Sequence, residues 1–152
     1  MAGSRHDNTA VTARLDDFLC FSIYAAEHAF SRTYKPMLAE LGLTYPQYLV
    51  MTLLWEEDDQ SVGQLGAKLS LESSTLTPLL KRLEAEGRLT RHRDKQDERV
   101  VRVKLTSAGD KLRECAAKIP ACILSATGMS LDELGKLREQ IIQLTKRLEE
   151  AS

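Results

Sequence analysis

The chain of 152 residues has few aromatic residues, three cysteines and no long hydrophobic run. No apolar segment approaches the roughly 18 residues that a membrane-spanning helix needs. The segment Met1 to Ala13 is polar, unlike the apolar centre of a signal peptide. These absences predict a cytoplasmic protein with no membrane partner, whose cysteines are reduced thiols rather than a disulfide framework.

Motifs for metal binding and catalysis are also missing. His6, His28 and His92 are scattered, and no cysteine pair has the spacing of metal ligands. The sequence contains no glycine-rich phosphate loop and no catalytic-triad spacing. We therefore expect no metal, no cofactor and no enzymatic activity. The nearest enzymatic alternative is a thiol peroxidase that uses Cys20, which would turn over in the presence of a reductant.

Positive charge is concentrated on one short segment. Residues 81–104 hold nine Lys and Arg against five Asp and Glu, a charge of +4, whereas the whole chain has a formal net charge of −1. Such a cluster indicates a surface that contacts phosphates. A solvated charged face is the alternative interpretation for an arbitrary run of charges.

The same segment has the pattern of a β-hairpin. Alternate residues of the run 101–105 are apolar, which is the two-residue period of a half-buried strand. The run 88–93 predicts the partner strand, and the polar residues 94–97 predict an exposed tip. We expect strands only in this hairpin.

Three helices are predicted before the hairpin. Two begin at the capping-box pairs Thr44 with Gln47 and Ser61 with Gln64, and they extend to about Trp55 and Leu69.

The third helix has leucines at helical spacing from Ser73 onward, and Gly87 is placed to end it. Pro78 lies about one turn into this helix, so the helix either starts later than Ser73 or bends there. Three helices and a basic hairpin predict a winged helix-turn-helix over residues 44–106, within a mainly α fold that has a small β wing.

The flanking segments 14–43 and 107–150 predict dimerisation helices of a single domain, 1–152. An N-terminal apolar stripe runs from Leu15 to Phe30, and a more regular one from Leu131 to Leu148 follows a capping box at Ser130. Such a stripe must be buried against another surface. A second copy is favoured over packing on the chain's own winged domain, because a single winged domain reads only a few bases.

Two stretches of the chain resemble a known family. They are LCFSIYAAEHAFSRTYKPMLAELGLTYPQYLVMTLLWE and LESSTLTPLLKRLEAEGRLTRHRDKQDERVVRVKLTSAG. They resemble the multiple antibiotic resistance regulator (MarR) family and, within it, the organic hydroperoxide resistance regulators (OhrR). The resemblance covers about residues 15–125. It implies a homodimeric repressor that binds a pseudo-palindromic operator in double-stranded DNA and releases it when an organic hydroperoxide oxidises one cysteine.

The resemblance also assigns residues. The sensing cysteine corresponds to Cys20, and the surrounding tyrosines correspond to Tyr24, Tyr34 and Tyr45, partly across the dimer interface. Arg99 corresponds to the wing arginine that enters the minor groove, with Asp97 placed to brace it. The residues that we expect to face DNA are Ser73, Ser74, Thr75, Thr77, Lys81, Arg82, Arg91, Arg93, Asp97 and Arg99.

The residues alone leave the role of the cysteines open. Asp16 and Asp17, at i−4 and i−3 on a helix, oppose ionisation of Cys20. The residues alone favour Cys20 as a buried structural thiol, and the resemblance reverses this preference. Cys115 and Cys122 are two turns apart on a single predicted helix, roughly 10 Å and too far to bridge each other. The resemblance implies a resolving cysteine on the partner subunit. Cys122 is favoured over Cys115, although either could be a packing residue.

Two alternative functions remain from the sequence. A regulator of the same fold could respond to a small phenolic or drug-like ligand, with no redox role for cysteine. A helical dimer that binds only protein would show no salt-dependent affinity for DNA.

Overall fold

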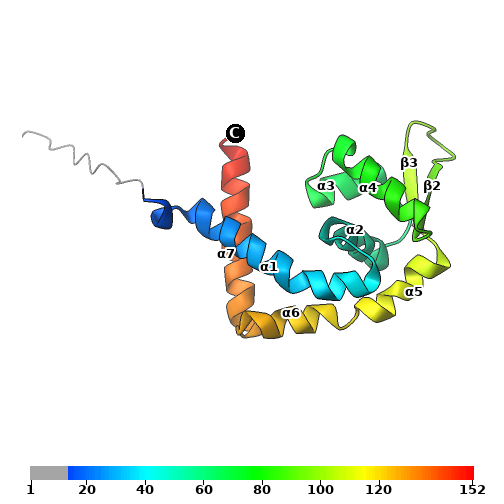
Figure 1. Ribbon diagram of the computed structural model, residues 1–152. Helices are drawn as coiled ribbons and strands as arrows, with labels where there is room; N and C mark the ends of the chain where they lie inside the picture. Colours follow the sequence, from blue (N-terminus) through cyan, green and yellow to red (C-terminus); the bar gives the residue numbers. More distant parts are fainter. Residues whose placement is uncertain (1–13) are drawn as a thin grey trace, which may run out of the picture. The chain divides into compact units, whose positions relative to one another are not determined.

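The computed structural model describes residues 14–152, so the expectation about Met1 to Ala13 lies outside the described residues. The described residues divide into two compact units, one that ends at Arg32 and one that comprises Thr33–Ser152. The elements are η1 (Leu15–Asp17), α1 (Leu19–Leu41), α2 (Tyr45–Glu56), β1 (Gln60–Ser61), α3 (Val62–Leu69), α4 (Ser73–Ala85), β2 (Leu89–Arg93), β3 (Val101–Leu105), α5 (Ser107–Ala116), α6 (Ile119–Thr127) and α7 (Leu131–Glu150) (Figure 1). The predicted mainly α fold with a small β wing is confirmed.

The predicted helix starts are confirmed by their capping geometry. Thr44 Oγ1 accepts a hydrogen bond from the Gln47 backbone N–H, and Gln47 Oε1 accepts one from the Thr44 backbone N–H. Ser61 and Ser130 form the same reciprocal box with the residue three positions later. Each box pairs two backbone groups that the first turn of a helix cannot pair internally.

Helix α4 begins at Ser73 and continues through Pro78 to Ala85, so a later start is wrong. Gly87 follows with a φ of +75°, the left-handed conformation that was predicted to end the helix. The Arg88 N–H then donates to the Leu83 carbonyl at 2.9 Å. This tight ending directs the chain immediately into β2.

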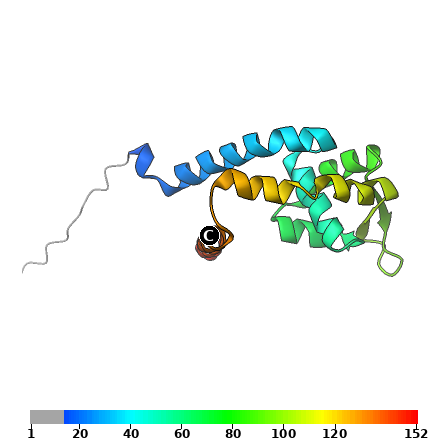
Figure 2. The ribbon, with the colours of Figure 1, turned by 90° about the horizontal axis from the view of Figure 1, so that it is seen from below.

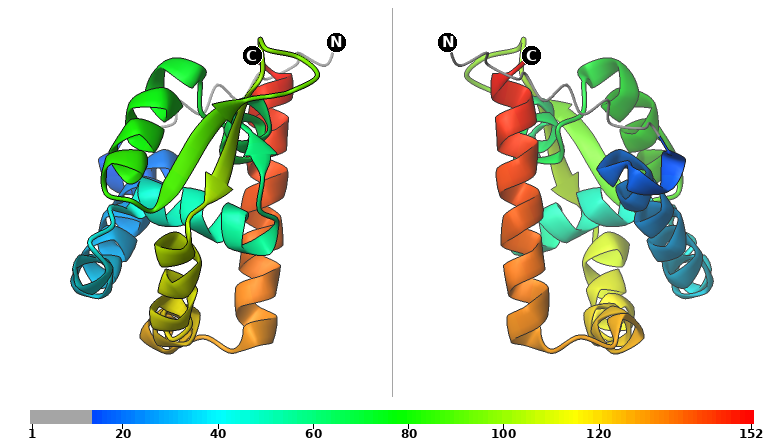
Figure 3. Two further views of the ribbon diagram at one scale, coloured as in Figure 1. Left: turned by 90° about the vertical axis from the view of Figure 1, so that its right-hand side faces the viewer. Right: turned by 90° about the vertical axis from the view of Figure 1, so that its left-hand side faces the viewer.

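The sheet has three strands in the order β1-β3-β2. β2 and β3 are neighbouring antiparallel strands (Figure 3). Leu89 lies opposite Leu105, and Arg93 lies opposite Val101. The expectation of strands only in the hairpin is wrong, because β1 pairs with the other edge of β3 at Gln60 and Val103. A two-residue strand is too short to show a period in the sequence.

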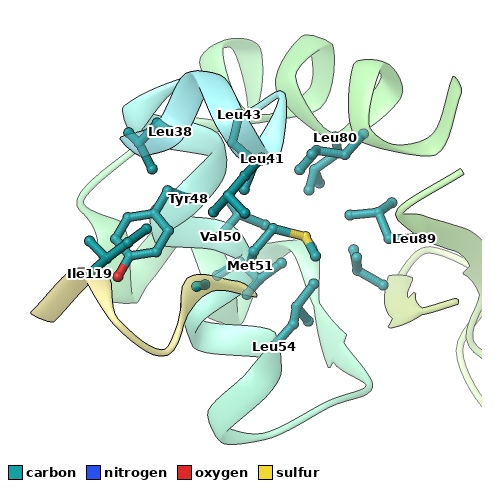
Figure 4. Close-up of a cluster of buried hydrophobic side chains, with 14 of the residues drawn as sticks. Leu38, Leu41, Leu43, Tyr48, Val50, Met51, Leu54, Leu80, Leu89 and Ile119 are labelled. Carbon is teal, nitrogen blue, oxygen red and sulfur yellow. The ribbon is translucent and has the colours of Figure 1, made fainter. Parts of the chain in front are cut away.

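The core lies where α2, α3 and α4 meet the inner face of the sheet. Leu54, Leu65 and Leu80 are fully buried, as is Val103 of the central strand. Figure 4 shows Leu80 and Leu89 beside residues of α2, around Met51. Because α4 and the hairpin pack on the same core, their positions relative to each other are fixed.

The segment after the hairpin forms two helices rather than the single helix that was predicted. α5 ends at Ala116 and α6 begins at Ile119, with Pro120 in its first turn (Figure 2). Proline is well suited to that position because it needs no hydrogen-bond acceptor there. Cys115 and Cys122 therefore lie on different helices, and the distance derived from one continuous helix does not apply.

Helix α7 has 20 residues, none of them buried. Its exposed apolar side chains are Leu131, Leu137, Ile141, Ile142 and Leu148.

Candidate functional site

Helix α4 has one face in the core and one in solvent. Leu76, Leu80 and Leu83 are buried, whereas Lys81 and Arg82 are exposed. Ser73, Ser74 and Thr75 are exposed on the first turn, and Thr77 is half-buried. Glu72, at the N-cap, makes no side-chain capping bond. The side chains of Ser73, Ser74 and Thr75 are therefore free to reach a ligand at the N-terminus of the helix, which favours phosphate. Lys81 and Arg82 are exposed toward the C-terminus of the same helix.

Arg99 lies beyond the tip of the hairpin, where its side chain is 91% exposed. Its Nε and Nη2 atoms donate to the two carboxylate oxygens of Asp97 at 3.0 and 3.1 Å. The Arg99 backbone N–H adds a third bond to Asp97. These bonds lower the pKa of Asp97, because the guanidinium favours the charged carboxylate. The geometry places Asp97 as a brace for a side chain that projects into solvent.

Arg91 has a different environment from the one we predicted. The Glu84 carboxylate accepts bonds from the Arg91 backbone N–H at 2.8 Å and from its Nη2 at 3.1 Å. The Arg91 side chain is 23% exposed. Arg93, which is exposed, donates to the Glu98 carbonyl at 2.8 Å. Arg91 thus ties β2 to α4, and of the two only Arg93 lies on the open surface.

Sequence reasoning missed a cluster where the strands of the wing meet its tip loop. Arg102 of β3 donates from Nε to Asp59 Oδ1 at 2.9 Å, and its Nη1 lies 3.5 Å from Asp94 Oδ2. Asp59 lies in the turn between α2 and β1, 43 positions earlier in the chain. No local pattern reveals a pair with such a separation.

Cys20 is the second residue of α1 and is exposed. Asp16 and Asp17 belong to the separate turn η1, and Phe18 is extended between η1 and α1. The i−4 and i−3 relation to Cys20 that a continuous helix would create is therefore absent. Cys20 lies instead in the first turn of α1, and the N-terminal end of a helix is the end that stabilises negative charge.

Tyr24 follows Cys20 by one turn of α1 and is 60% exposed. Its ring packs on His28, with 4.3 Å between ring centres. Cys20 and Tyr24 lie in the unit that ends at Arg32, and Tyr34 and Tyr45 lie in the other unit.

Tyr34 and Tyr45 are brought together, with 5.0 Å between their ring centres. Tyr48, which sequence reasoning missed, lies 6.0 Å from Tyr34 and extends the aromatic group. Burial, together with the neighbouring Tyr45 and Tyr48, raises the pKa of Tyr34 to about 12. Tyr34 is therefore a neutral hydrogen-bond donor at any physiological pH.

Cys115 and Cys122 are both exposed, on either side of the junction between α5 and α6. Lys118 of this junction forms an ion pair with Glu40 at 3.1 Å, and the carboxylate raises the pKa of Lys118.

Within residues 14–152, no group of His, Cys, Asp and Glu is arranged to hold a metal ion. No helix in this range is long and apolar enough to cross a membrane.

Comparison with known proteins identifies the family. Residues 32–115 match the family model described as transcriptional regulator SarA/Rot. The chain is 42% identical over 135 residues to the organic hydroperoxide resistance transcriptional regulator of Bacillus subtilis, covering 89% of this chain and 92% of that protein. The chain belongs to the MarR family of transcriptional regulators.

A second MarR-like relative is the regulator TtmR of Methylorubrum extorquens, which is 48% identical over 88% of this chain and 69% of its own length. Among solved structures, reduced AbfR bound to DNA is 38% identical, with a TM-score of 0.76 over 89% of this chain and 94% of that chain. The structure of disulfide-formed AbfR has a TM-score of 0.65 at 39% identity, over 90% and 93% of the two chains. Like other members of the MarR family, the chain is a DNA-binding transcriptional regulator and not an enzyme.

Proposed function

We propose that the protein is a homodimeric repressor that senses organic hydroperoxides through Cys20 and then releases its operator. The observation that carries the proposal is the exposed Cys20 thiol in the first turn of α1, in a chain 42% identical to an organic hydroperoxide regulator. The names of the AbfR structures describe a reduced form bound to DNA, an overoxidized form bound to DNA and a disulfide form. They support reversible cysteine chemistry in that relative, and they favour a disulfide rather than an overoxidised sulfur as the state that releases the operator.

The proposed DNA interface combines α4 with the wing. Ser73, Ser74 and Thr75 would approach the major groove, Lys81 and Arg82 the phosphates, and Arg99 the minor groove. Thr77, which is half-buried, is left out of the proposed contacts. Arg93 would add a backbone contact. Arg91 would contribute through its bond to Glu84 rather than by contacting DNA.

The exposed apolar faces support a dimer. Leu137 and Ile141 of α7 are 41% and 43% exposed, and Leu148 is 61% exposed. A helix of 20 residues with a regular apolar stripe and no buried residue gains stability when a second copy covers that stripe. Two-fold symmetry would also place two wings on the two halves of a pseudo-palindromic operator. Segments 14–43 and 107–150 are the proposed dimerisation helices.

The proposed oxidation proceeds in two steps. The Cys20 thiolate attacks the peroxide O–O bond, so that sulfur gains one oxygen as sulfenic acid and the alkoxide leaves as the alcohol after taking a proton. The thiol of Cys122 of the partner subunit then displaces water to form a disulfide. Tyr24, Tyr34 and Tyr45 would surround the reacting sulfur. The resulting helix displacement would move the two wings off operator spacing.

The test is a DNA-binding titration on the upstream region of the protein's own gene. Reduced wild type and Cys20→Ser are expected to bind with equal affinity. A few equivalents of an organic hydroperoxide should release only wild type. Release of both would contradict cysteine sensing and favour a repressor that responds to a small ligand.

The variants Cys122→Ser and Cys115→Ser test which of the two cysteines forms the disulfide with oxidised Cys20. A non-reducing gel of peroxide-treated Cys115→Ser should show a crosslinked dimer, and Cys122→Ser should show none. A crosslink that persists in Cys122→Ser would transfer the resolving role to Cys115.

A further inference from the structure

We propose that Arg102 is a positioning residue that presents Arg99 to DNA and makes no phosphate contact of its own. The inference rests on the DNA-binding role proposed above for Arg99, and it adds the network that holds Arg99 in place.

All three nitrogen atoms of the Arg102 guanidinium have a polar partner within the protein. Nε donates to Asp59 Oδ1 at 2.9 Å, Nη2 donates to the Asp59 backbone carbonyl, and Nη1 lies 3.5 Å from Asp94 Oδ2. Its side chain is 28% exposed, compared with 91% for Arg99. Arg102 therefore lacks the free fork of donors with which an arginine binds phosphate.

Asp94 connects Arg102 to the tip of the wing. Its Oδ1 accepts the backbone N–H of Gln96 at 2.7 Å and that of Asp97 at 3.3 Å. These bonds, with Arg102, lower the pKa of Asp94. The Asp94 N–H also donates to the Val100 carbonyl at 2.8 Å, which closes the loop. Asp94 thus sets the backbone of the residue that braces Arg99.

Asp97 completes the connection. Its carboxylate receives the backbone N–H, Nε and Nη2 of Arg99. A continuous polar chain therefore runs from Asp59 through Arg102, Asp94 and Asp97 to Arg99.

The Asp59 end of this series of polar contacts is fixed to the turn that follows α2. Asp58 Oδ1 accepts the backbone N–H of Leu105 at 2.8 Å, which ties the turn after α2 to β3. His92 Nε2 lies 3.9 Å from Asp59 Oδ1. Asp59 has a φ of +56°, a conformation that the surrounding contacts maintain. The polar chain can thus hold the wing tip at a set distance from α4.

The experiment is a double-mutant cycle with salt titration, using operator DNA and reduced full-length protein. Arg102→Gln should weaken binding about tenfold when Arg99 is present. In the Arg99→Ala background it should change neither the affinity nor the salt dependence. A further fall of about 0.9 in the salt slope in that background would mean that Arg102 contacts a phosphate itself, which would overturn the proposal.

Two further variants separate position from charge. Arg102→Lys keeps the charge but not the fork, and it should weaken binding as Arg102→Gln does. Affinity like that of wild type would overturn the proposal. Lys104→Gln removes one charge from an exposed site on the same strand, and its effect should add to that of Arg99→Ala.

Circular dichroism and thermal unfolding check that each variant is folded. If the Arg102 variants do not fold, Asp94→Asn tests the next link and should also be non-additive with Arg99→Ala. Additivity would overturn the proposal and leave the role of Arg99 intact. Unchanged affinity of Arg99→Ala alone would overturn both.

Discussion

Arg91 and Arg99 belong to the same basic hairpin and have different roles. Both bind a carboxylate, but the Arg91 bond joins two secondary-structure elements, whereas the Arg99 bond orients an exposed side chain. A count of charges in the sequence cannot distinguish these two roles, because it does not show which carboxylate pairs with which arginine in the fold.

Removal of the Arg99 side chain should weaken operator binding and reduce the preference for a narrow minor groove. The salt slope of binding should fall by about 0.9, because one cationic contact is lost. Lys81→Ala is the comparison, since loss of a phosphate contact weakens binding uniformly across sequences. Operators that differ only in an A-tract provide the measurement. Equal loss of affinity on all of them would contradict a minor-groove role for Arg99.

The sequence predicted single residues well where the signal was local. The caps at Thr44, Ser61 and Ser130 depend on residues three positions apart, and all three are present in the structure. Arg102 with Asp59 depends on the tertiary fold, so the sequence contained no sign of it. Tyr48 was missed because a tyrosine inside an apolar helix looks like any core residue.

At the scale of elements, α4 and β2 are joined by Glu84. The carboxylate accepts from the backbone and side chain of Arg91, and these bonds lower the pKa of Glu84 from its ordinary value of 4.5. This link adds to the shared core and restricts the angle between the helix and the wing.

Glu84→Gln should therefore reduce stability in a pH-dependent way. Because the folded pKa is lower than the unfolded one, the stabilisation is fully present above pH 4.5 and is lost as pH falls through the folded pKa. The Glu84 side chain is 37% exposed, so screening keeps the difference below about 1 kcal/mol. Urea unfolding of wild type and variant at neutral and acid pH provides the measurement. Glu86→Gln, at an exposed position of the same helix end, is the control.

The predicted helix boundaries were wrong near proline, because proline can either start a new helix or lie inside an existing one. Pro120 falls within a segment predicted as a single helix and is instead in the first turn of a new helix, whereas Pro78 lies inside α4. Proline removes one hydrogen-bond donor in each case, and the packing around it decides whether the helix stops.

At the scale of the whole molecule, the proposed dimer depends on the apolar stripe of α7. Ile141→Glu places a charge in the middle of this stripe and should shift the protein toward monomer, because an unpaired charge is costly in an apolar interface. Sedimentation velocity measures the change, and affinity for the full operator should fall toward that for a half-site. Gln143→Glu adds the same charge to the other side of the helix and should leave the dimer intact. A dimer unchanged by Ile141→Glu would contradict the assigned interface.

The sheet has a consequence for solubility. β3 is the central strand, paired by β2 along its length and by β1 at Arg102 and Val103. The remaining long edge belongs to β2, which carries Arg91, His92 and Arg93. Cationic side chains on an edge strand oppose the addition of a strand from another molecule. Arg93, which the proposed interface brings to the DNA backbone, thus also protects this edge from edge-to-edge aggregation.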